Sequence, residues 1–394
     1  MIYLDNGATT WPKPECVYAA MDDYARNGAV NAGRGAYKAA REAGDMIRET
    51  RELLISLMDA REQAQVVLAP SVTVAINQVI LGRPWQAGSA AYVSPYEHNA
   101  VLRPLEQLRQ KKGILVKELP LREDGSIDLE ATEQAFADCP PDFVAVTAVS
   151  NVTGYILPVR EIFTLAKRYK AFTLLDGAQA AGLLKLRFAY LRADVVTFAG
   201  HKTLYGPFGV GGFLIKNGVD LDIVLSGGTG TDSESLQMPR RMPGKMECAS
   251  KDIVAIRGLN EALKWLRHEK PLEKERVLMD YLLDSLVQIP GIHIYGAPDR
   301  SLQAGVVSIN IDGFKCGEAA AILDDRFDIA VRAGHHCAAL IHRHLGDKAF
   351  GGTLRISISL FTTREEIDAL IAGLKTLDRD MLKNIDDNIL RGLC

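Results

Sequence analysis

TLLDGAQAAG at residues 173–182 and VVTFAGHKTLYGPFGVGG at residues 195–212 are the two stretches that decide the fold. Each begins as a short apolar run typical of a buried strand and ends in polar residues. The first ends at Asp176, with Gln179 one turn later, and the second runs into His201 and Lys202. In open α/β sheets, ligands bind at the carboxyl ends of the strands. The two stretches therefore predict two strands of one sheet with a ligand site at their ends.

Similar apolar runs lie on both sides of these stretches and predict the rest of the sheet. Segments with helical spacing, such as 99–111 and 159–168, separate the runs. Strands that alternate with helices indicate crossover units, and hence a parallel sheet covered on both faces. We expect an α/β fold with a mainly parallel seven-stranded sheet. Its predicted strands are 65–69, 90–93, 114–119, 143–149, 172–175, 195–199 and 212–215.

The pattern changes after about residue 260 and predicts a smaller α+β domain. Two helical stretches are followed by two alternating strands and a closing helix. Thr363 and Glu366 are expected to form a capping box at the start of that last helix. We expect a large α/β domain at 15–260 and a small domain formed by 1–14 and 261–394. The helical stretches are 260–269 and 272–289, and the strands are 305–311 and 352–360.

Composition excludes several classes of protein. The chain has 394 residues, 47% of them hydrophobic and 24% charged, with a net charge of −3. These values are ordinary for a globular protein and lack the basic footprint of a nucleic-acid binder. No apolar run approaches the ~18 residues of a membrane helix, and MIYLDNGATT has no basic region typical of a signal peptide. Six scattered cysteines indicate a reducing compartment, so we expect a cytoplasmic protein without nucleic-acid or membrane partners.

Asp176 and Lys202 together indicate one cofactor. A lysine in a semi-apolar pocket can attack a carbonyl as the free amine, and a carboxylate at the end of a buried strand needs a cationic partner. Pyridoxal phosphate uses both, a lysine for its aldehyde and a carboxylate that keeps its ring nitrogen protonated. Taken singly, Asp176 is equally well a helix cap, and Lys202 is more often a solvated side chain.

Three motifs carry a resemblance to a known family. These are DGAQ at 176–179, GHK at 200–202 and the opening IYLDNGATTWPKP at 2–14. With them the chain resembles the class V aminotransferase family of fold-type I pyridoxal-phosphate enzymes, and within it the cysteine desulfurase or selenocysteine lyase subgroup. The resemblance implies that Lys202 bonds to the cofactor aldehyde, that Asp176 pairs with the pyridine nitrogen, and that Gln179 contacts the ring hydroxyl.

The resemblance extends to the segment LAPSVTVAINQV at 68–79 and implies a phosphate site there. The segment places Ser71, Val72 and Thr73 in a turn before a helix, where backbone N–H groups suit an anion and the Thr73 hydroxyl adds a donor. The alternative is an ordinary strand-to-helix turn with a capping residue.

Four further cofactor contacts are implied by the resemblance. His98 stacks on the ring and moves protons, and Asn151 lies near the ring hydroxyl and the substrate carboxylate. His201 contacts the phosphate, more so because Ala199 stands where the family usually has serine. Thr229 lies in a loop that reaches the phosphate of a neighbouring subunit, which implies a homodimer with active sites at the subunit interface.

The segment AVRAGHHCAALIHRHLG at 330–346 resembles the mobile-cysteine segment of the desulfurases with a short active-site loop. The resemblance implies that Cys337 takes sulfur from the substrate as a persulfide. The chemistry requires a thiolate, and Arg332, His335 and His336 are expected to provide positive potential that favours it. A cysteine without this context is more often a small buried hydrophobe.

A zinc site is the alternative for the same segment. Zinc accepts histidine and thiolate ligands, and five such residues fall within ten positions. Because no second pair of ligands has the usual spacing, we expect no metal site. His342 and His344 are then expected at the surface.

GTLRISISL at 352–360 alternates apolar and polar residues, so Arg355 lies on the face opposite the apolar side chains. A guanidinium can hold a carboxylate through two parallel hydrogen bonds, and the resemblance implies that Arg355 binds the α-carboxylate of the substrate together with Asn151 and Arg332. The alternative is a solvent-facing strand arginine.

The chain departs from the family pattern at several places. Tyr37 replaces a histidine in the stretch that begins with Asn31 and Arg34, and residues 247–250 read ECAS, which is expected to alter the substrate entrance. Cys394 is the last residue of the sequence and is a sulfur relay, a disulfide partner or an inert thiol.

These observations predict a cysteine desulfurase that converts L-cysteine to L-alanine and passes sulfur to Cys337, and then to a sulfur acceptor that the sequence does not identify. Selenocysteine lyase, cysteine lyase or sulfinate desulfinase activity on the same scaffold stays open. A catalytically idle sulfur-carrier scaffold and a zinc-binding protein are the alternatives from other classes.

Overall fold

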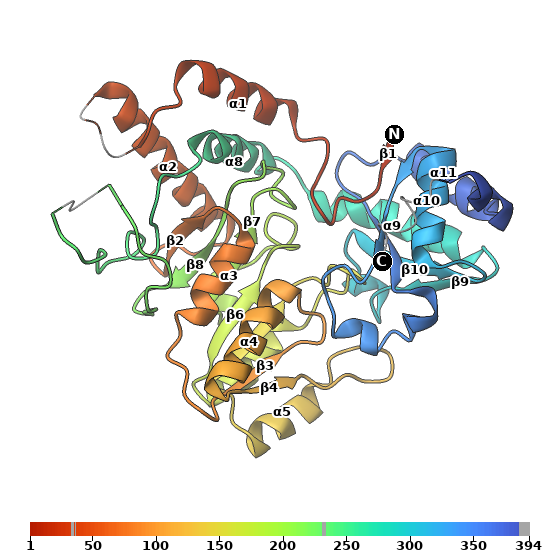
Figure 1. The fold of residues 1–394 in the computed structure, drawn as a ribbon, viewed down its shortest axis with the longest axis horizontal. Helices are drawn as coiled ribbons and strands as arrows, with labels where there is room; N and C mark the ends of the chain where they lie inside the picture. Colours follow the sequence, from red (N-terminus) through yellow and green to blue (C-terminus); the bar gives the residue numbers. More distant parts are fainter. Residues whose placement is uncertain (33–34, 36, 231–233, 386–394) are drawn as a thin grey trace.

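The computed structural model describes residues 1–32, 35, 37–230 and 234–385. The two larger of three sheets organise this part of the chain, a seven-stranded sheet in a larger part and a four-stranded sheet in a smaller part beside it (Figure 1).

The seven-stranded sheet has the order β2-β8-β7-β6-β5-β3-β4. All its neighbouring strands run parallel except β8, which is antiparallel to both β2 and β7. The predicted α/β class and mainly parallel sheet are confirmed. The strands are β2 (Ala64–Ala69), β3 (Ala90–Val93), β4 (Leu115–Glu118), β5 (Phe143–Thr147), β6 (Phe172–Asp176), β7 (Val195–Ala199) and β8 (Gly211–Lys216).

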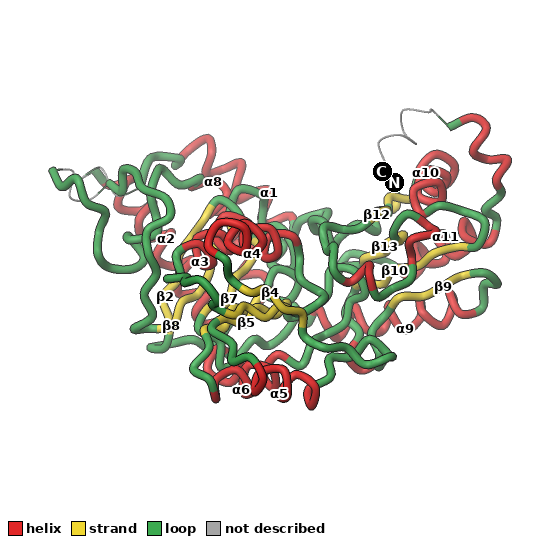
Figure 2. Tube along the Cα trace, turned by 60° about the horizontal axis from the view of Figure 1, so that its bottom comes forward, coloured by secondary structure: helices red, strands yellow, loops and turns green. Residues whose placement is uncertain are grey.

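Helices cover both faces of this sheet, with α3 and α4 on one side and α5 and α6 on the other (Figure 2). Alternate residues of β5 enter the two cores, because side chains alternate along a strand: Val144 and Val146 join one, and Phe143 and Ala145 the other. The helices of the larger part are α1 (Glu15–Asn27), α2 (Lys38–Leu57), α3 (Val72–Leu81), α4 (Asn99–Lys112), α5 (Leu129–Asp138), α6 (Val159–Arg168), α7 (Phe188–Leu191) and α8 (Ile253–Leu266).

The smaller part is an antiparallel sheet of order β12-β13-β10-β9 with its own apolar core. The N-terminal strand β1 (Ile2–Tyr3) pairs in parallel with β11 (Ile329–Ala330), so the chain start lies on the C-terminal part. The predicted division into two domains, with its boundaries, stays a prediction. The elements are β9 (Ile292–Tyr295), β10 (Val306–Ile311), β12 (Arg332–Gly334), β13 (Thr353–Ser357), α9 (Pro271–Val287), α10 (Cys316–Phe327), α11 (Arg364–Lys375) and short 3₁₀ turns at Arg300–Leu302, Ile341–Arg343, Asp347–Phe350 and Arg379–Asn384.

Several boundaries differ from the sequence predictions. The capping box of α11 is confirmed, since the Glu366 N–H donates to Thr363 Oγ1 (3.3 Å) and the Thr363 N–H donates to Glu366 Oε2 (2.9 Å). The helix predicted at 260–269 begins earlier, because Asp252 caps it by accepting from the Ala255 N–H. The sequence predictions missed β1, α1, α2, β9, α10, β11 and β12. In the described part of the chain, no helix is both long and apolar enough to cross a bilayer.

Candidate active site

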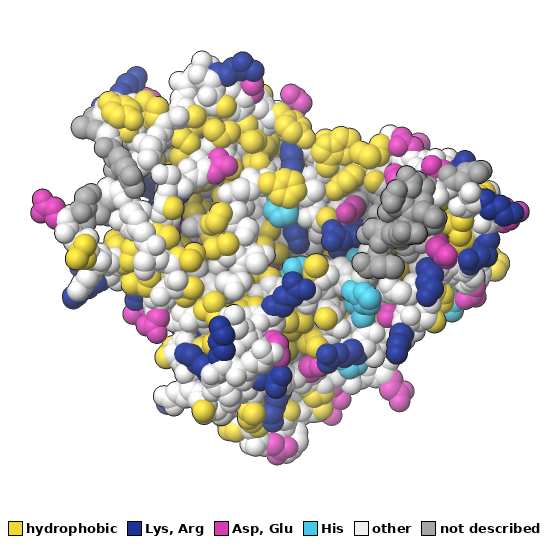
Figure 3. All heavy atoms as spheres, in the orientation of Figure 1, with side chains coloured by type: hydrophobic (Ala, Val, Ile, Leu, Met, Phe, Trp, Pro, Cys, Tyr) yellow, Lys and Arg dark blue, Asp and Glu magenta, His cyan; other side chains and the backbone are white. Residues whose placement is uncertain are grey.

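One cavity of about 230 Å³ collects most of the predicted site residues. Eleven of the thirteen line it. The two that do not are Ser71, which precedes α3, and Thr229, which lies on the loop after β8; the role of Thr229 concerns a neighbouring subunit and stays a prediction. The lining residues are Gly7, Ala8, Val72, Thr73, Ile76, His98, Ala100, Thr147, Asn151, Asp176, Ala178, Gln179, His201, Lys202, Arg332, His336, Cys337 and Arg355. On the face drawn in Figure 3, histidine and cationic side chains gather in the hollow between the two parts of the molecule.

Asp176 is the last residue of β6, and Lys202 follows the neighbouring strand β7. Burial lowers the pKa of Lys202 to about 8, and the nearby Asp176 carboxylate opposes that shift. A free amine is therefore present at neutral pH, as a nucleophilic lysine requires. Asp176 Oδ1 accepts hydrogen bonds from the Ala178 N–H (2.9 Å) and from Thr197 Oγ1 (3.2 Å). The helix-cap alternative is wrong, since a turn and not a helix follows Asp176.

An N-terminal segment holds the peptide that carries Lys202. Thr9 Oγ1 donates to the His201 carbonyl (2.9 Å), Thr10 Oγ1 to the Lys202 carbonyl (3.1 Å), and Lys13 Nζ to the His201 carbonyl (2.8 Å). Burial lowers the pKa of Lys13 to about 7. Sequence reasoning missed all three residues, although they lie in the opening motif that carried the resemblance.

The start of α3 offers backbone donors to the cavity. Ser71 Oγ caps the helix by accepting from the Val74 N–H (3.2 Å), while the N–H groups of the first helical residues have no partner within the helix. Val72 and Thr73 are those first residues, so the prediction that they belong to a turn before the helix is corrected by the Ser71 cap. A Cβ on Gly211 would lie 2.6 Å from the Val72 nitrogen, so the glycine lets β8 approach the helix start.

His201 and His98 are both neutral in this site. Burial lowers the pKa of His201 to about 3 and that of His98 to about 4. The His201 ring stacks on Phe208, and its Nδ1 is buried without a hydrogen-bond partner among the described residues. His98 Nδ1 accepts from the Ala100 N–H (3.0 Å), which leaves the proton of the neutral ring on Nε2. Sequence reasoning missed Glu97, a fully buried carboxyl whose pKa burial raises to about 8.

Cys337 is exposed at the rim of the cavity on a tight turn. His336 and Cys337 both have a positive φ, 48° and 56°, a conformation that costs a non-glycine residue about 1–2 kcal/mol. Hydrogen bonds hold this turn: the Asn99 N–H donates to the Cys337 carbonyl (2.6 Å), and Asn151 Nδ2 donates to the His336 carbonyl (2.7 Å). The predicted contacts of Asn151 with cofactor and substrate stay a prediction.

The structure corrects two histidine expectations. His336 is only 5% exposed, and its Nε2 lies within hydrogen-bond distance of Thr353 Oγ1 (3.0 Å). Burial holds the pKa of His336 well below the usual range. It is therefore neutral and does not add the expected positive potential. The His342 side chain is also 5% exposed because it pairs with Asp347, so its predicted surface position is wrong, whereas His344 is 43% exposed as predicted.

The residues of the zinc alternative all lie in the described part of the chain. Within that part, no group of three or more His, Cys, Asp or Glu side chains is placed so that it could hold a metal ion.

Arg355 lies on the predicted face of β13, but that face is not open to solvent. The residue is 2% exposed, because the N-terminal segment covers it, so the solvent-facing alternative is wrong. It pairs with the Asp5 carboxylate and donates to the Asn151 carbonyl.

The departures from the family pattern lie away from the cavity lining where they are described. Glu247 is buried, where it pairs with Arg51 and Lys251 and accepts from the Leu68 N–H. Tyr37 is exposed. Arg34 and Cys394 lie outside the described residues.

Comparison with known proteins shows the family of the chain. The model of the class V aminotransferase family matches residues 2–370. A probable cysteine desulfurase of Halalkalibacterium halodurans is 34% identical over 385 residues, 95% of this chain and 92% of the relative. A cysteine desulfurase of Pectobacterium carotovorum is 32% identical, over 96% of this chain and 93% of the relative.

Solved structures show the same fold. The apo structure of a cysteine desulfurase from Thermococcus onnurineus has a TM-score of 0.88 at 29% identity and covers 95% of this chain and 94% of that one. The cysteine desulfurase CsdA from Escherichia coli, solved as its S-sulfonic acid, has a TM-score of 0.82 at 25% identity and covers 100% and 95%. The resemblance inferred from the motifs is confirmed. With a family model matched over nearly its whole length, the chain belongs to the class V aminotransferase family.

Proposed function

We propose that the protein is a pyridoxal-phosphate-dependent cysteine desulfurase, which converts L-cysteine to L-alanine and takes the sulfur onto Cys337. One observation carries the proposal: the exposed Cys337 lines the same cavity as the buried amine of Lys202 and the carboxylate of Asp176. The relatives and solved neighbours that are named cysteine desulfurases support it.

The residues present fit the cofactor. The Lys202 amine suits its aldehyde, Asp176 its pyridine nitrogen, and the N–H groups of Val72 and Thr73 its phosphate. The unpartnered Nδ1 of His201 adds a polar atom at the same site. Gln179 already donates through Nε2 to the Gly7 carbonyl (2.7 Å), so its Oε1 remains to accept from the ring hydroxyl. When bound, pyridoxal phosphate supplies an electron sink for the carbanion that forms at the substrate Cα.

The protein groups then handle the substrate and its protons. Arg355 binds the α-carboxylate, and the Lys202 amine removes the proton from the substrate Cα. The Cys337 thiolate attacks the substrate sulfur, so that an S–S bond forms and the Cβ–S bond breaks with its electron pair left on the carbon fragment. Protonation of that fragment at Cβ, assisted by Nε2–H of His98, and return of the proton from Lys202 to Cα give L-alanine and a persulfide on Cys337.

The proposal includes the surroundings of this reaction. We infer a cytoplasmic homodimer in which Thr229 reaches the neighbouring subunit's site, and an acceptor that removes sulfur from Cys337. Transamination alone gives no role to a cysteine at this position, which disfavours an aminotransferase.

The test compares Cys337→Ala with Cys139→Ala in the reconstituted protein. Cys139 ends α5 and is not part of the cavity, so its variant serves as the matched control. We expect Cys337→Ala to keep the yellow colour of the bound cofactor but to lose sulfide and persulfide formation from L-cysteine, while Cys139→Ala keeps both. Undiminished sulfide release by Cys337→Ala would contradict the mechanism. Turnover of L-selenocysteine but not of L-cysteine by the wild type would identify a lyase instead.

A further inference from the structure

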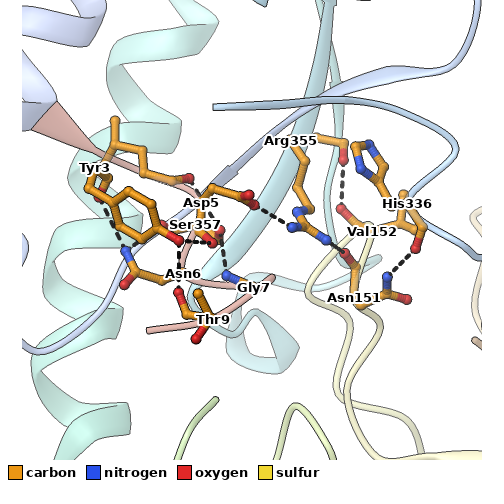
Figure 4. A network of polar contacts seen from close by, with 12 residues as sticks. Tyr3, Asp5, Asn6, Gly7, Thr9, Asn151, Val152, His336, Arg355 and Ser357 are labelled. Carbon is orange, nitrogen blue, oxygen red and sulfur yellow. Dashed lines mark hydrogen bonds and ion pairs between the residues drawn. The ribbon is translucent and has the colours of Figure 1, made fainter. Parts of the chain in front are cut away.

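The guanidinium of Arg355 is buried between the N-terminal segment and the loop after β5. It comes from β13 and meets Asp5, just after β1, on one side and Asn151, in the loop after β5, on the other (Figure 4). A buried guanidinium without a partner is costly. The described part of the chain gives Arg355 one acidic partner, Asp5.

A count of hydrogens shows what these partners leave free. Nη1 donates to the Asn151 carbonyl (3.0 Å), and Nη2 donates to Asp5 Oδ1 (2.5 Å). Each Nη carries two hydrogens, so one N–H remains on each. Nε is buried without a partner among the described residues. The two remaining Nη hydrogens match the two oxygens of one carboxylate, and Arg355 lines the cavity.

Hydrogen bonds hold the backbone next to Asp5 in place. The Gly7 N–H donates to Ser357 Oγ (2.7 Å), and Asn6 Nδ2 donates to the Ser357 carbonyl (3.0 Å). These contacts join the N-terminal segment to β13, the strand that carries Arg355 (Figure 4). A Cβ on Gly7 would lie 3.2 Å from Arg355 Cζ, so glycine there lets the segment lie against the guanidinium.

We propose that Asp5 is a positioning residue for substrate recognition: with the Asn151 carbonyl it clamps the Arg355 guanidinium so that one N–H of each Nη faces the α-carboxylate of an amino acid. The inference rests on the proposed function for the identity of that amino acid. Because Asp5 neutralises Arg355, recognition depends on the alignment of these two N–H groups more than on net charge. The affinity for ligands that lack a carboxylate does not depend on Asp5.

The proposal predicts a graded series of variants. Asp5→Ala removes the acceptor, frees the guanidinium to turn, and weakens binding of L-alanine about tenfold to a hundredfold, the range of a charge-assisted hydrogen bond. Asp5→Asn keeps an acceptor oxygen at the same place and retains most of the affinity. Asp5→Glu keeps the charge but moves the carboxylate, and so weakens binding as Asp5→Ala does. Asp312→Ala, at an exposed aspartate of the same part of the molecule, is the matched control and leaves binding unchanged.

The experiment titrates the reconstituted proteins with L-alanine and with ethylamine, which has no carboxylate, by isothermal titration calorimetry. We expect Asp5→Ala to lower the affinity for L-alanine and to leave the affinity for ethylamine unchanged. In a protein that already carries Arg355→Met, Asp5→Ala should cause no further loss of affinity for L-alanine, because the two residues act together. Equal affinity of wild type and Asp5→Ala for L-alanine would overturn the proposal, as would a loss in Asp5→Asn equal to that in Asp5→Ala. If Asp5→Ala does not fold, the comparison of Asp5→Glu with Asp5→Asn decides.

The same titration separates this proposal from the proposed function. Binding of L-alanine is measured without turnover, so the Asp5 series is scored even if L-cysteine releases no sulfide. A wild-type protein that desulfurates L-cysteine but shows no Asp5 effect refutes the clamp alone. A wild type that does not prefer L-alanine to ethylamine refutes carboxylate recognition by Arg355, and the clamp with it.

Discussion

Lys202 in the cofactor-free protein should react with a small aldehyde at neutral pH far faster than an ordinary lysine. Its pKa is lowered to about 8 because burial disfavours the charged ammonium. At pH 7 a group with that pKa is about 10% free amine, whereas a lysine of ordinary pKa is about 0.03% free amine. The difference in reactive fraction is about 300-fold.

Limited reductive methylation with formaldehyde, followed by peptide mass spectrometry, measures this fraction for each lysine between pH 6 and pH 10. Lys38 is the internal control, since its side chain is 83% exposed. We expect Lys202 labelling to reach half its maximum near pH 8. Because the Asp176 carboxylate raises the pKa of Lys202, Asp176→Asn should shift this midpoint to lower pH. A Lys202 that titrates together with Lys38, or a midpoint that rises in Asp176→Asn, would refute the reasoning.

Three further predictions concern residues around the site. Burial raises the pKa of Glu97 to about 8, so between about pH 4 and pH 8 the folded chain keeps a proton that the unfolded chain loses. The free energy of unfolding, measured with urea, should therefore fall as pH rises through this window. Glu97→Gln should flatten this pH dependence, and an unchanged slope would contradict the prediction. Ser71→Ala removes the cap of α3 and should lower the free energy of unfolding by about 1 kcal/mol, measured by urea titration, with no loss if the cap contributes nothing. Lys13→Met removes a donor to the His201 carbonyl and should speed amide hydrogen exchange in residues 199–206; unchanged exchange would mean that Lys13 does not hold this peptide.

The sequence was sufficient for elements whose signal is local. The seven strands of the large sheet are short apolar runs between turn residues, and Asp176 and Lys202 were recognised because each follows such a run. Burial of Arg355 was not predictable from its strand. The alternation of apolar and polar residues assigns each side chain to one of two faces of the strand, but it does not show which other segment covers a face. The cover comes from Asp5, 350 positions away in the sequence.

Other errors have the same physical cause. Lys13 reaches the His201 carbonyl across 188 positions, a contact that spacing and periodicity do not encode. His342 reads as one of several polar residues on a surface turn, yet it is buried by pairing with Asp347. Pairing lets a polar side chain lie inside a protein, and a local pattern does not reveal the partner.

Transfer of sulfur from L-cysteine to Cys337 is the central claim, and intact-protein and peptide mass spectrometry tests it most directly. The reconstituted protein is incubated briefly with L-cysteine, its thiols are blocked, and the peptide that contains Cys337 is analysed. The account predicts that this peptide gains the mass of one sulfur atom while L-alanine appears in equal amount. L-Alanine formation with no added sulfur on Cys337 would contradict it.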